Sequence, residues 1–280
     1  MIFQDKTVII TGGSEGVGAA TARLFAEAGA NLMLVARGKK NLEAAAEALR
    51  DKTRVEIFAM DVSDSDACVD VFKKAKFEFG RVDVLVNNAG YHARGAVEAV
   101  EPHDLAKMVE VNLRAPIVLS RIALPYVRES GAGAIINVGS LAGRIAYPGA
   151  ATYAASKAGL RSFTLALAEE LRGTEIKIGL VSPGPISTAF IMADMDKVSD
   201  ITFSQPMATA EEVAQVVLDL CGNNIREECM PRSSGYLATI FGLMPWLARL
   251  IRPSLERKGQ KVRQRLKAEQ KRRESDSPDR

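Results

Sequence analysis

A tyrosine and a lysine stand four residues apart at Tyr153 and Lys157, in the sequence Tyr-Ala-Ala-Ser-Lys. On a helix, this spacing puts both side chains on one face. A nearby ammonium favours the phenolate and lowers the pKa of a tyrosine. Tyr153 could therefore give a proton to a carbonyl oxygen and take it back in the reverse direction. The pair alone is common by chance, so its meaning depends on the residues around it.

A glycine-rich segment follows the first apolar run of the chain. It reads Thr-Gly-Gly-Ser-Glu-Gly-Val-Gly at residues 11–18, and a helical pattern begins directly after it. Glycines let the backbone approach a pyrophosphate closely, and a helix N-terminus offers free N–H groups and a positive dipole end. A plain tight turn is the alternative, but the spacing favours a dinucleotide-binding loop.

The end of the second apolar run indicates which dinucleotide is bound. An NAD site would place an acid there, whereas this chain has Ala36-Arg37. An arginine could pair with a 2′-phosphate, so we predict NADP(H). Glu15 argues weakly against NADP(H), because some NADP sites carry a basic group near that position. Asp61-Val62 follows the third run and is expected to contact the adenine.

Short apolar runs alternate with longer segments of helical spacing through the first 180 residues. The runs lie at 7–10, 32–35, 55–58, 82–86, 134–138 and 176–181. The helical patterns lie at 17–28, 41–50, 66–79, 103–128 and 152–172. Apolar runs without alternation are typical of strands buried on both faces. We therefore predict an α/β fold of the Rossmann type, with a doubly wound parallel sheet in a single domain.

Taken together, these motifs resemble those of the short-chain dehydrogenase/reductase family. The matching residues are TGGSEGVG at 11–18, NNAG at 87–90, Ser140, YAASK at 153–157 and Pro183-Gly184. The resemblance covers about residues 1–220. It implies an NADP-dependent oxidoreductase that acts on a C=O/CH–OH pair and needs no metal.

The resemblance also implies roles for individual residues. Tyr153 would donate the proton, Lys157 would hold the nicotinamide ribose, and Ser140 would orient the substrate oxygen. Asn112 would link the lysine to a proton-relay water. The expected cofactor contacts are Gly12, Ser14, Glu15, Gly16, Val17, Gly18, Arg37, Asp61, Val62, Asn88, Ala89, Gly90, Tyr153, Lys157, Pro183, Gly184, Ile186 and Thr188.

The substrate pocket is expected between Ser140 and Tyr153 and under a lid at residues 187–208. Besides Ser140, the candidate substrate contacts are Arg144, Tyr147 and Phe190. The lid is apolar enough to bind an apolar substrate, although the same residues could simply cover the hydrophobic core. His92 follows the NNAG motif and could reach the substrate pocket, but it is interpreted as a loop histidine.

The chain departs from the family towards its C-terminus. Many members end in a strand and a Gly-Gly turn at a tetramer interface, whereas this chain reads Cys229-Met230-Pro231. We therefore expect a homodimer through the helices at 103–128 and 152–172, and the tetramer is in doubt. The expected units are a Rossmann domain at 1–230, an apolar helical extension at 231–256 and a basic, disordered tail at 257–280.

Residues 237–251 are apolar except for Arg249, and Pro245 is expected to break or restart the helix. The run is too short for a bilayer span. Residues 252–280 hold eleven Lys or Arg and five acids, a net charge of +6. Residues 237–273 thus fit a segment lying on an anionic membrane surface. The alternative is a helix pair packed over the substrate mouth or on another subunit.

The amino-acid composition excludes several classes of protein and of binding site. The 280 residues are 47% hydrophobic and 25% charged, which excludes a disordered or fibrous chain. Two histidines and three scattered cysteines predict neither a metal site nor a disulfide framework. The basic end lacks interleaved aromatics, so nucleic acid is not expected. We expect a cytoplasmic protein. A peripheral position at the inner face of a membrane is the second location considered.

The sequence thus favours NADPH-dependent reduction of a ketone to a secondary alcohol. The apolar and basic C-terminal end resembles the branch of the family that reduces lipid-like ketones, with 3-ketodihydrosphingosine or another 3-keto compound as the substrate. One alternative is a dehydrogenase of a steroid or a small secondary alcohol. Another is a cofactor-binding sensor or scaffold without turnover.

Overall fold

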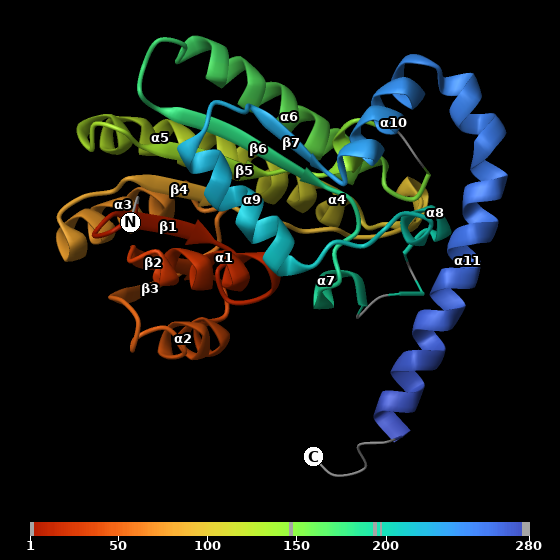
Figure 1. Cartoon of the computed structure of the whole chain (residues 1–280), viewed down its shortest axis with the longest axis horizontal. Helices are drawn as coiled ribbons and strands as arrows, with labels where there is room; N and C mark the ends of the chain where they lie inside the picture. The colour runs from red at the N-terminus through yellow and green to blue at the C-terminus, as the bar shows by residue number, and fades with distance from the viewer. Residues whose placement is uncertain (1–2, 146–147, 193–194, 197, 276–280) are drawn as a thin grey trace.

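The computed structural model describes residues 3–145, 148–192, 195–196 and 198–275. Within them, a central sheet has seven parallel strands in the order β3-β2-β1-β4-β5-β6-β7 (Figure 1). The strands are β1 (Thr7–Thr11), β2 (Asn31–Ala36), β3 (Val55–Ala59), β4 (Val84–Asn87), β5 (Ala134–Val138), β6 (Lys177–Pro183) and β7 (Glu227–Met230). The direction of the strand order reverses between β1 and β4, which is where open parallel sheets bind ligands.

Helices cover both faces of the sheet. The longer helices are α1 (Gly16–Glu27), α2 (Lys39–Glu47), α3 (Ser65–Phe79), α4 (Pro102–Val109), α5 (Ala115–Glu129), α6 (Ala151–Glu170), α9 (Ala210–Gly222), α10 (Arg232–Leu243) and α11 (Pro245–Ser275). The short ones are η1 (Val97–Ala99), η2 (Glu110–Arg114), η3 (Leu141–Gly143), α7 (Ala189–Met192) and α8 (Asp200–Phe203).

The core has two layers because side chains alternate along each strand. Ile10 packs with α1, α2 and α9 on one face, whereas the neighbouring Ile9 packs with α3 and α5 on the other. Both side chains are fully buried. This two-sided burial explains why the strands read as continuous apolar runs.

One sequence expectation about these elements was wrong. The chain does form a final strand, β7, which pairs with β6 at the edge of the sheet. The sequence Glu227-Glu228-Cys229-Met230 hides it, because none of its residues is fully buried and two are acidic. The helical pattern at 103–128 is confirmed, and a π-helical turn, η2, joins α4 to α5 within it.

The C-terminal residues form two helices. α10 ends at Leu243 and α11 begins at Pro245, so the chain restarts at the proline as expected. The structure differs from the expected disorder after residue 257, since α11 continues to Ser275 (Figure 1). Val262 and Leu266 pack on a small cluster around α8, and Arg263 pairs with Asp200 at 2.9 Å. These tertiary contacts stabilise a helix whose own sequence is strongly polar.

Among the described helices, none is both long and apolar enough to cross a bilayer.

Candidate active site

A cavity of about 1280 Å³ lies at the carboxyl ends of the strands. Residues following β1, β2, β4, β5 and β6 line it, because parallel strands bring their carboxyl ends to one edge of the sheet. Most of the predicted site residues meet in this one cavity. Those that line it are Gly12, Ser14, Glu15, Gly16, Val17, Arg37, Asp61, Val62, Asn88, Ala89, Gly90, Ser140, Arg144, Tyr153, Lys157, Pro183, Gly184, Ile186, Thr188 and Phe190.

Two of the described residues that were predicted for the site lie elsewhere. Gly18 and Asn112 do not line the cavity and instead support residues that do. Tyr147 lies outside the described residues.

The glycine loop between β1 and α1 is shaped by backbone constraints. Gly12 and Gly16 have φ angles of +66° and +54°, which residues with side chains rarely adopt. A Cβ on Gly18 would lie 2.0 Å from the carbonyl oxygen of Gly12. Asn88 donates from its side-chain amide to the same oxygen, at 3.1 Å. The loop is therefore held close against α1, whose N-terminus opens on the cavity.

The charges on the cavity wall near β2 and β3 come from Arg37 and Asp61. Arg37 is exposed directly after β2. Asp61 accepts hydrogen bonds from Ser63 and Lys107. Burial opposes ionisation of Asp61, but these bonds lower its pKa to about 2. Arg37 is thus the cation at the carboxyl end of β2, and Asp61 is already engaged by neighbours.

The tyrosine, lysine and serine meet where α6 passes the end of β5. A hydrogen bond joins the Tyr153 and Ser140 side chains. Burial raises the pKa of Tyr153, and that bond offsets only part of the rise. Lys157 donates to the carbonyl oxygen of Val138 at 2.8 Å, and burial lowers its pKa to about 8. The expectation that Lys157 lowers the pKa of Tyr153 was therefore wrong, because burial raises it.

Asn112 occupies the π-helical turn η2 and is fully buried. Its side chain accepts from the Tyr91 N–H and donates to the Tyr91 carbonyl oxygen, both at 2.8 Å. It also donates to Ser156 at 3.2 Å. Asn112 thus ties the NNAG loop to α6 between Tyr153 and Lys157. A π-turn inside a helix is often found at functional sites.

His92 lies in a loop, as interpreted from the sequence, but it also lines the cavity, which was the other possibility. Its imidazole stacks on the Tyr153 ring with centroids 4.0 Å apart and an interplanar angle of 11°. Burial, with smaller contributions from Arg94 and Lys157, lowers the pKa of His92 to about 3. The histidine is therefore neutral near pH 7. Its only sequence signal is its position two residues after NNAG.

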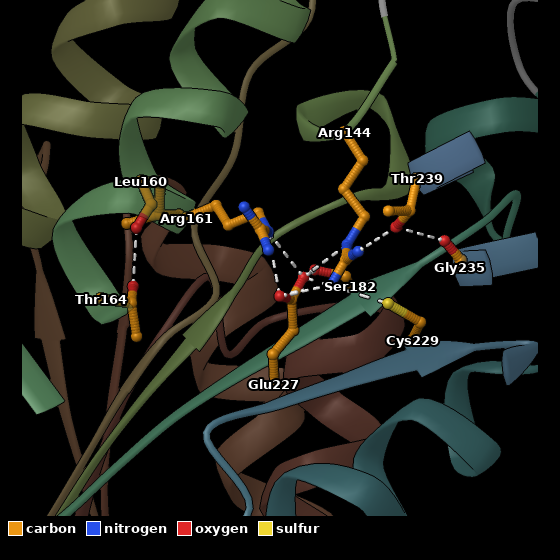
Figure 2. A network of polar contacts seen from close by, with 9 residues as sticks. All are labelled: Arg144, Leu160, Arg161, Thr164, Ser182, Glu227, Cys229, Gly235 and Thr239. Atoms are coloured by element: carbon orange, nitrogen blue, oxygen red, sulfur yellow. Dashed lines mark hydrogen bonds and ion pairs between the residues drawn. The ribbon is translucent and has the colours of Figure 1, made fainter. Parts of the chain in front are cut away.

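Arg144 lines the cavity as expected, but its guanidinium is engaged by protein groups. It donates to Glu227 on β7 and to Thr239 on α10 (Figure 2). Glu227 had no sequence signal, because its strand was not predicted.

The C-terminal helices complete the cavity wall. Leu237 and Phe241 of α10 line it, as do Ala248 and Leu255 of α11. The side of α10 and α11 that lines the cavity therefore matches the alternative in which a helix pair packs over the substrate mouth. Their other side remains exposed around Leu243 and Trp246.

Comparisons with known proteins agree with this geometry. Residues 6–198 match a family model described as short chain dehydrogenase. The chain is 35% identical over 230 residues to a 3-oxoacyl-[acyl-carrier-protein] reductase of Thermotoga maritima, covering 80% of this chain and 93% of that protein. It is 35% identical over 222 residues to an NADP-dependent 3-hydroxy acid dehydrogenase of Schizosaccharomyces pombe, covering 76% and 85%.

A solved structure shows the same similarity. The chain resembles a short chain dehydrogenase from Burkholderia cenocepacia in complex with NADP, with a TM-score of 0.74 and 30% identity. The match covers 81% of this chain and 96% of the other.

Proposed function

Because this chain belongs to the short-chain dehydrogenase family, we propose that it is an NADPH-dependent reductase that converts a ketone to a secondary alcohol. One observation carries the proposal: Ser140, Tyr153 and Lys157 meet in the same cavity as the glycine loop and Arg37. The relatives named as a reductase and an NADP-dependent dehydrogenase support the same class of reaction.

The residues present fit a bound NADP(H). The left-handed Gly12 and Gly16 form a backbone cradle beside the α1 N-terminus, and the close approach of Gly18 to Gly12 keeps it in place. That cradle suits a pyrophosphate, and Arg37 suits a 2′-phosphate. Pro183-Gly184, Ile186 and Thr188 would face the nicotinamide end, with Lys157 on its ribose. NADPH supplies a hydride when bound.

The remaining chemistry belongs to the chain. Tyr153 gives its proton to the carbonyl oxygen, and Ser140 donates a hydrogen bond that orients that oxygen. A raised pKa keeps the phenol protonated at neutral pH, which suits a general acid in the direction of reduction. Asn112 fixes α6 through Ser156, so Tyr153 and Lys157 keep their places. The same groups serve oxidation of an alcohol, the alternative direction.

The substrate is an apolar ketone, with 3-keto lipids as the leading class. Phe190, Leu237, Phe241 and Leu255 give the cavity apolar walls beyond Ser140. We propose measuring NADPH oxidation with a long-chain and a short 3-keto ester. Turnover of the long ester at a lower KM supports this substrate class. Equal use of both esters contradicts it, and a sterol alcohol with NADP⁺ tests the dehydrogenase alternative.

The outer side of α10 and α11 supports a position on an anionic membrane surface. Four large apolar side chains there are between 60% and 79% exposed: Tyr236, Leu243, Trp246 and Leu250. Residues 245–275 add eleven basic and three acidic groups. A two-fold contact between copies would bring these like charges together. At an anionic membrane surface, in contrast, each basic group contributes about 1 kcal/mol of electrostatic attraction. The same helices line the cavity, so an apolar substrate would have a short route inward.

The membrane proposal is tested by sedimentation with phosphatidylcholine vesicles with and without phosphatidylserine. The wild-type chain should sediment only with the anionic vesicles. The variant Leu243→Ser/Trp246→Ser/Leu250→Ser should stay in solution, and Phe77→Ser, which changes an exposed phenylalanine on α3, should behave as wild type. Equal sedimentation of all three contradicts the proposal. If the triple variant sediments like the wild type but has a different oligomeric state, the exposed side chains form a contact between copies instead.

We also propose a homodimer through α4, α5 and α6, as expected from the family.

A further inference from the structure

Glu227 is a buried carboxylate at the meeting point of four elements (Figure 2). It accepts from Arg144 at 2.9 Å and 2.5 Å through the two oxygens, in a fork geometry. It also accepts from Arg161, at 2.9 Å and 3.1 Å, and from the Ser182 hydroxyl at 2.9 Å. Burial alone would raise the pKa of Glu227, but the bonds and charges of the two arginines lower it below its usual range.

Each partner of Glu227 belongs to a segment that supplies a group to the candidate active site. Arg144 closes the η3 turn, in which the Ser140 hydroxyl caps the N–H of Ala142. Arg161 lies on α6 one turn after Lys157. Ser182 immediately precedes Pro183-Gly184 at the end of β6.

We propose that Glu227 is a positioning residue that sets the spacing of Ser140, Tyr153 and the end of β6 for the reaction. This inference rests on the proposed reductase function. Glu227 itself is not among the residues that line the cavity, so it acts through Arg144, Arg161 and Ser182. A single carboxylate can set this spacing because charge-assisted, forked bonds are strong and directional.

The packing around the network explains why small shifts would matter. A Cβ on Gly143 would lie 2.7 Å from the Lys157 carbonyl oxygen, so the η3 turn rests directly on α6. A Cβ on Gly139 would lie 3.3 Å from the Ser182 hydroxyl. The turn therefore lies between α6 and β6 with no spare room. Loss of the Glu227 bonds would let the turn move relative to Tyr153.

Arg144 extends the network to the cavity wall. The Arg144 guanidinium donates to Thr239 of α10 at 2.7 Å. Gly242 of the same helix lies against the backbone carbonyl oxygen of Arg144. α10 also contributes Leu237 and Phe241 to the cavity. The wall that would contact the substrate is thus tied to the turn that carries Ser140.

The test compares Glu227→Gln with Glu228→Gln. Glu228 is the next residue of β7, on the opposite face, and it pairs with Arg232. Glu227→Gln should lower kcat for ketone reduction about 100-fold, the size expected for a misplacement of about 1 Å, with NADPH affinity within about twofold. Glu228→Gln should keep the wild-type kcat. A kcat within about twofold of wild type in Glu227→Gln would overturn the proposal.

A readout that needs no turnover separates this inference from the proposed function. The N–H groups of Ala142, Gly143 and Arg144 bond within the η3 turn. Their hydrogen exchange should accelerate in Glu227→Gln and stay unchanged in Glu228→Gln. If the wild-type chain reduces no ketone, the proposed reaction fails, and the exchange result still decides whether Glu227 holds the turn. Unchanged exchange in Glu227→Gln overturns it.

Two further variants apply if Glu227→Gln does not fold. Glu227→Asp keeps the charge but withdraws the carboxylate by one methylene, so it should fold and still show a lowered kcat. Thr239→Val cuts only the link from Arg144 to α10. It should raise the KM for the ketone about threefold to tenfold and leave kcat unchanged. Wild-type kcat in Glu227→Asp, or a wild-type KM in Thr239→Val, would contradict the corresponding part of the proposal.

Discussion

The two ends of the cavity are built by different physical means. At the β1–α1 end, glycines with no room for a Cβ and fully buried strands fix the backbone. At the α10–α11 end, α11 packs closely on α8, where a Cβ on Gly259 would lie 1.7 Å from the Asp200 carbonyl oxygen and Arg263 pairs with Asp200, but both helices leave large apolar side chains exposed. The first end is enclosed by the core, whereas the second combines a closely packed backbone with exposed apolar and charged groups.

This difference explains which part of the molecule its relatives share. The family model matches residues 6–198, which include the glycine loop, Ser140, Tyr153 and Lys157. It does not extend to α10 and α11. The shared part holds the residues proposed for the reaction, and we infer that the C-terminal helices adapt it to a particular substrate and surface. The predictions below test each end of this comparison.

Among changes at the two ends of the cavity, the largest effect is expected from filling the glycine cradle. In Gly18→Ala, the new Cβ would meet the Gly12 carbonyl oxygen, so the loop must move. NADPH should bind about 100-fold more weakly, as measured by quenching of the single tryptophan or by calorimetry. Gly222→Ala is the control, because nothing lies within 4 Å of its Cβ position. Normal NADPH binding by Gly18→Ala would show that the loop is not the cradle.

A smaller effect is expected from reversing the charge at the end of β2. Arg37→Asp should repel a 2′-phosphate and lower the preference for NADPH over NADH about 10- to 100-fold. Lys39→Asp reverses a nearby exposed charge that does not line the cavity. The ratio of kcat/KM for the two cofactors measures the effect. If both variants change the ratio equally, general electrostatics rather than Arg37 selects the cofactor.

The pH dependence tests the buried centre between the two ends. The pKa of Lys157 is lowered to about 8, so its ammonium is lost as the pH rises above that value. The kcat/KM for NADPH should therefore fall on the alkaline side, several-fold by one pH unit above. The pKa of His92 is lowered to about 3, so no change is expected near its ordinary value of 6.5. A step near 6.5 that disappears in His92→Phe would contradict the buried, neutral histidine.

The smallest effect is expected where α11 packs on α8. Leu266→Ala should lower the free energy of unfolding by about 1–2 kcal/mol, below the range for a fully buried leucine, because Leu266 is only partly buried. NADPH affinity should not change, since this contact lies away from the glycine loop. Gln264→Ala, at an exposed position of the same helix, is the control for chemical denaturation. A loss of NADPH affinity in Leu266→Ala would mean that the two ends are coupled.

The sequence predicted the shared part well because its signals are local. Each strand of the first six is a short apolar run, and the glycine loop and Tyr153/Lys157 are recognisable within a few residues. Most predicted cofactor and catalytic positions therefore lie together in one cavity.

The rest could not be predicted because it depends on contacts distant in sequence. Glu227 bonds Arg144 across 83 residues, and nothing near either residue indicates the pairing. β7 was missed because its edge strand is only half-buried. The part of α11 from residue 257 was taken for a disordered tail because its packing on α8, through Val262 and Leu266, has no signal in its strongly basic sequence.

The most direct test of the account compares the wild-type chain with Tyr153→Phe. Both should bind NADPH with the same affinity, since the phenol hydroxyl is assigned to proton transfer. Oxidation of NADPH by a long-chain 3-keto ester should occur with the wild type and fall about 100- to 10,000-fold in Tyr153→Phe. Equal turnover by both proteins would contradict the assignment of Tyr153 as the proton donor. Absence of turnover in the wild type with ketones of every length would contradict the reductase function itself.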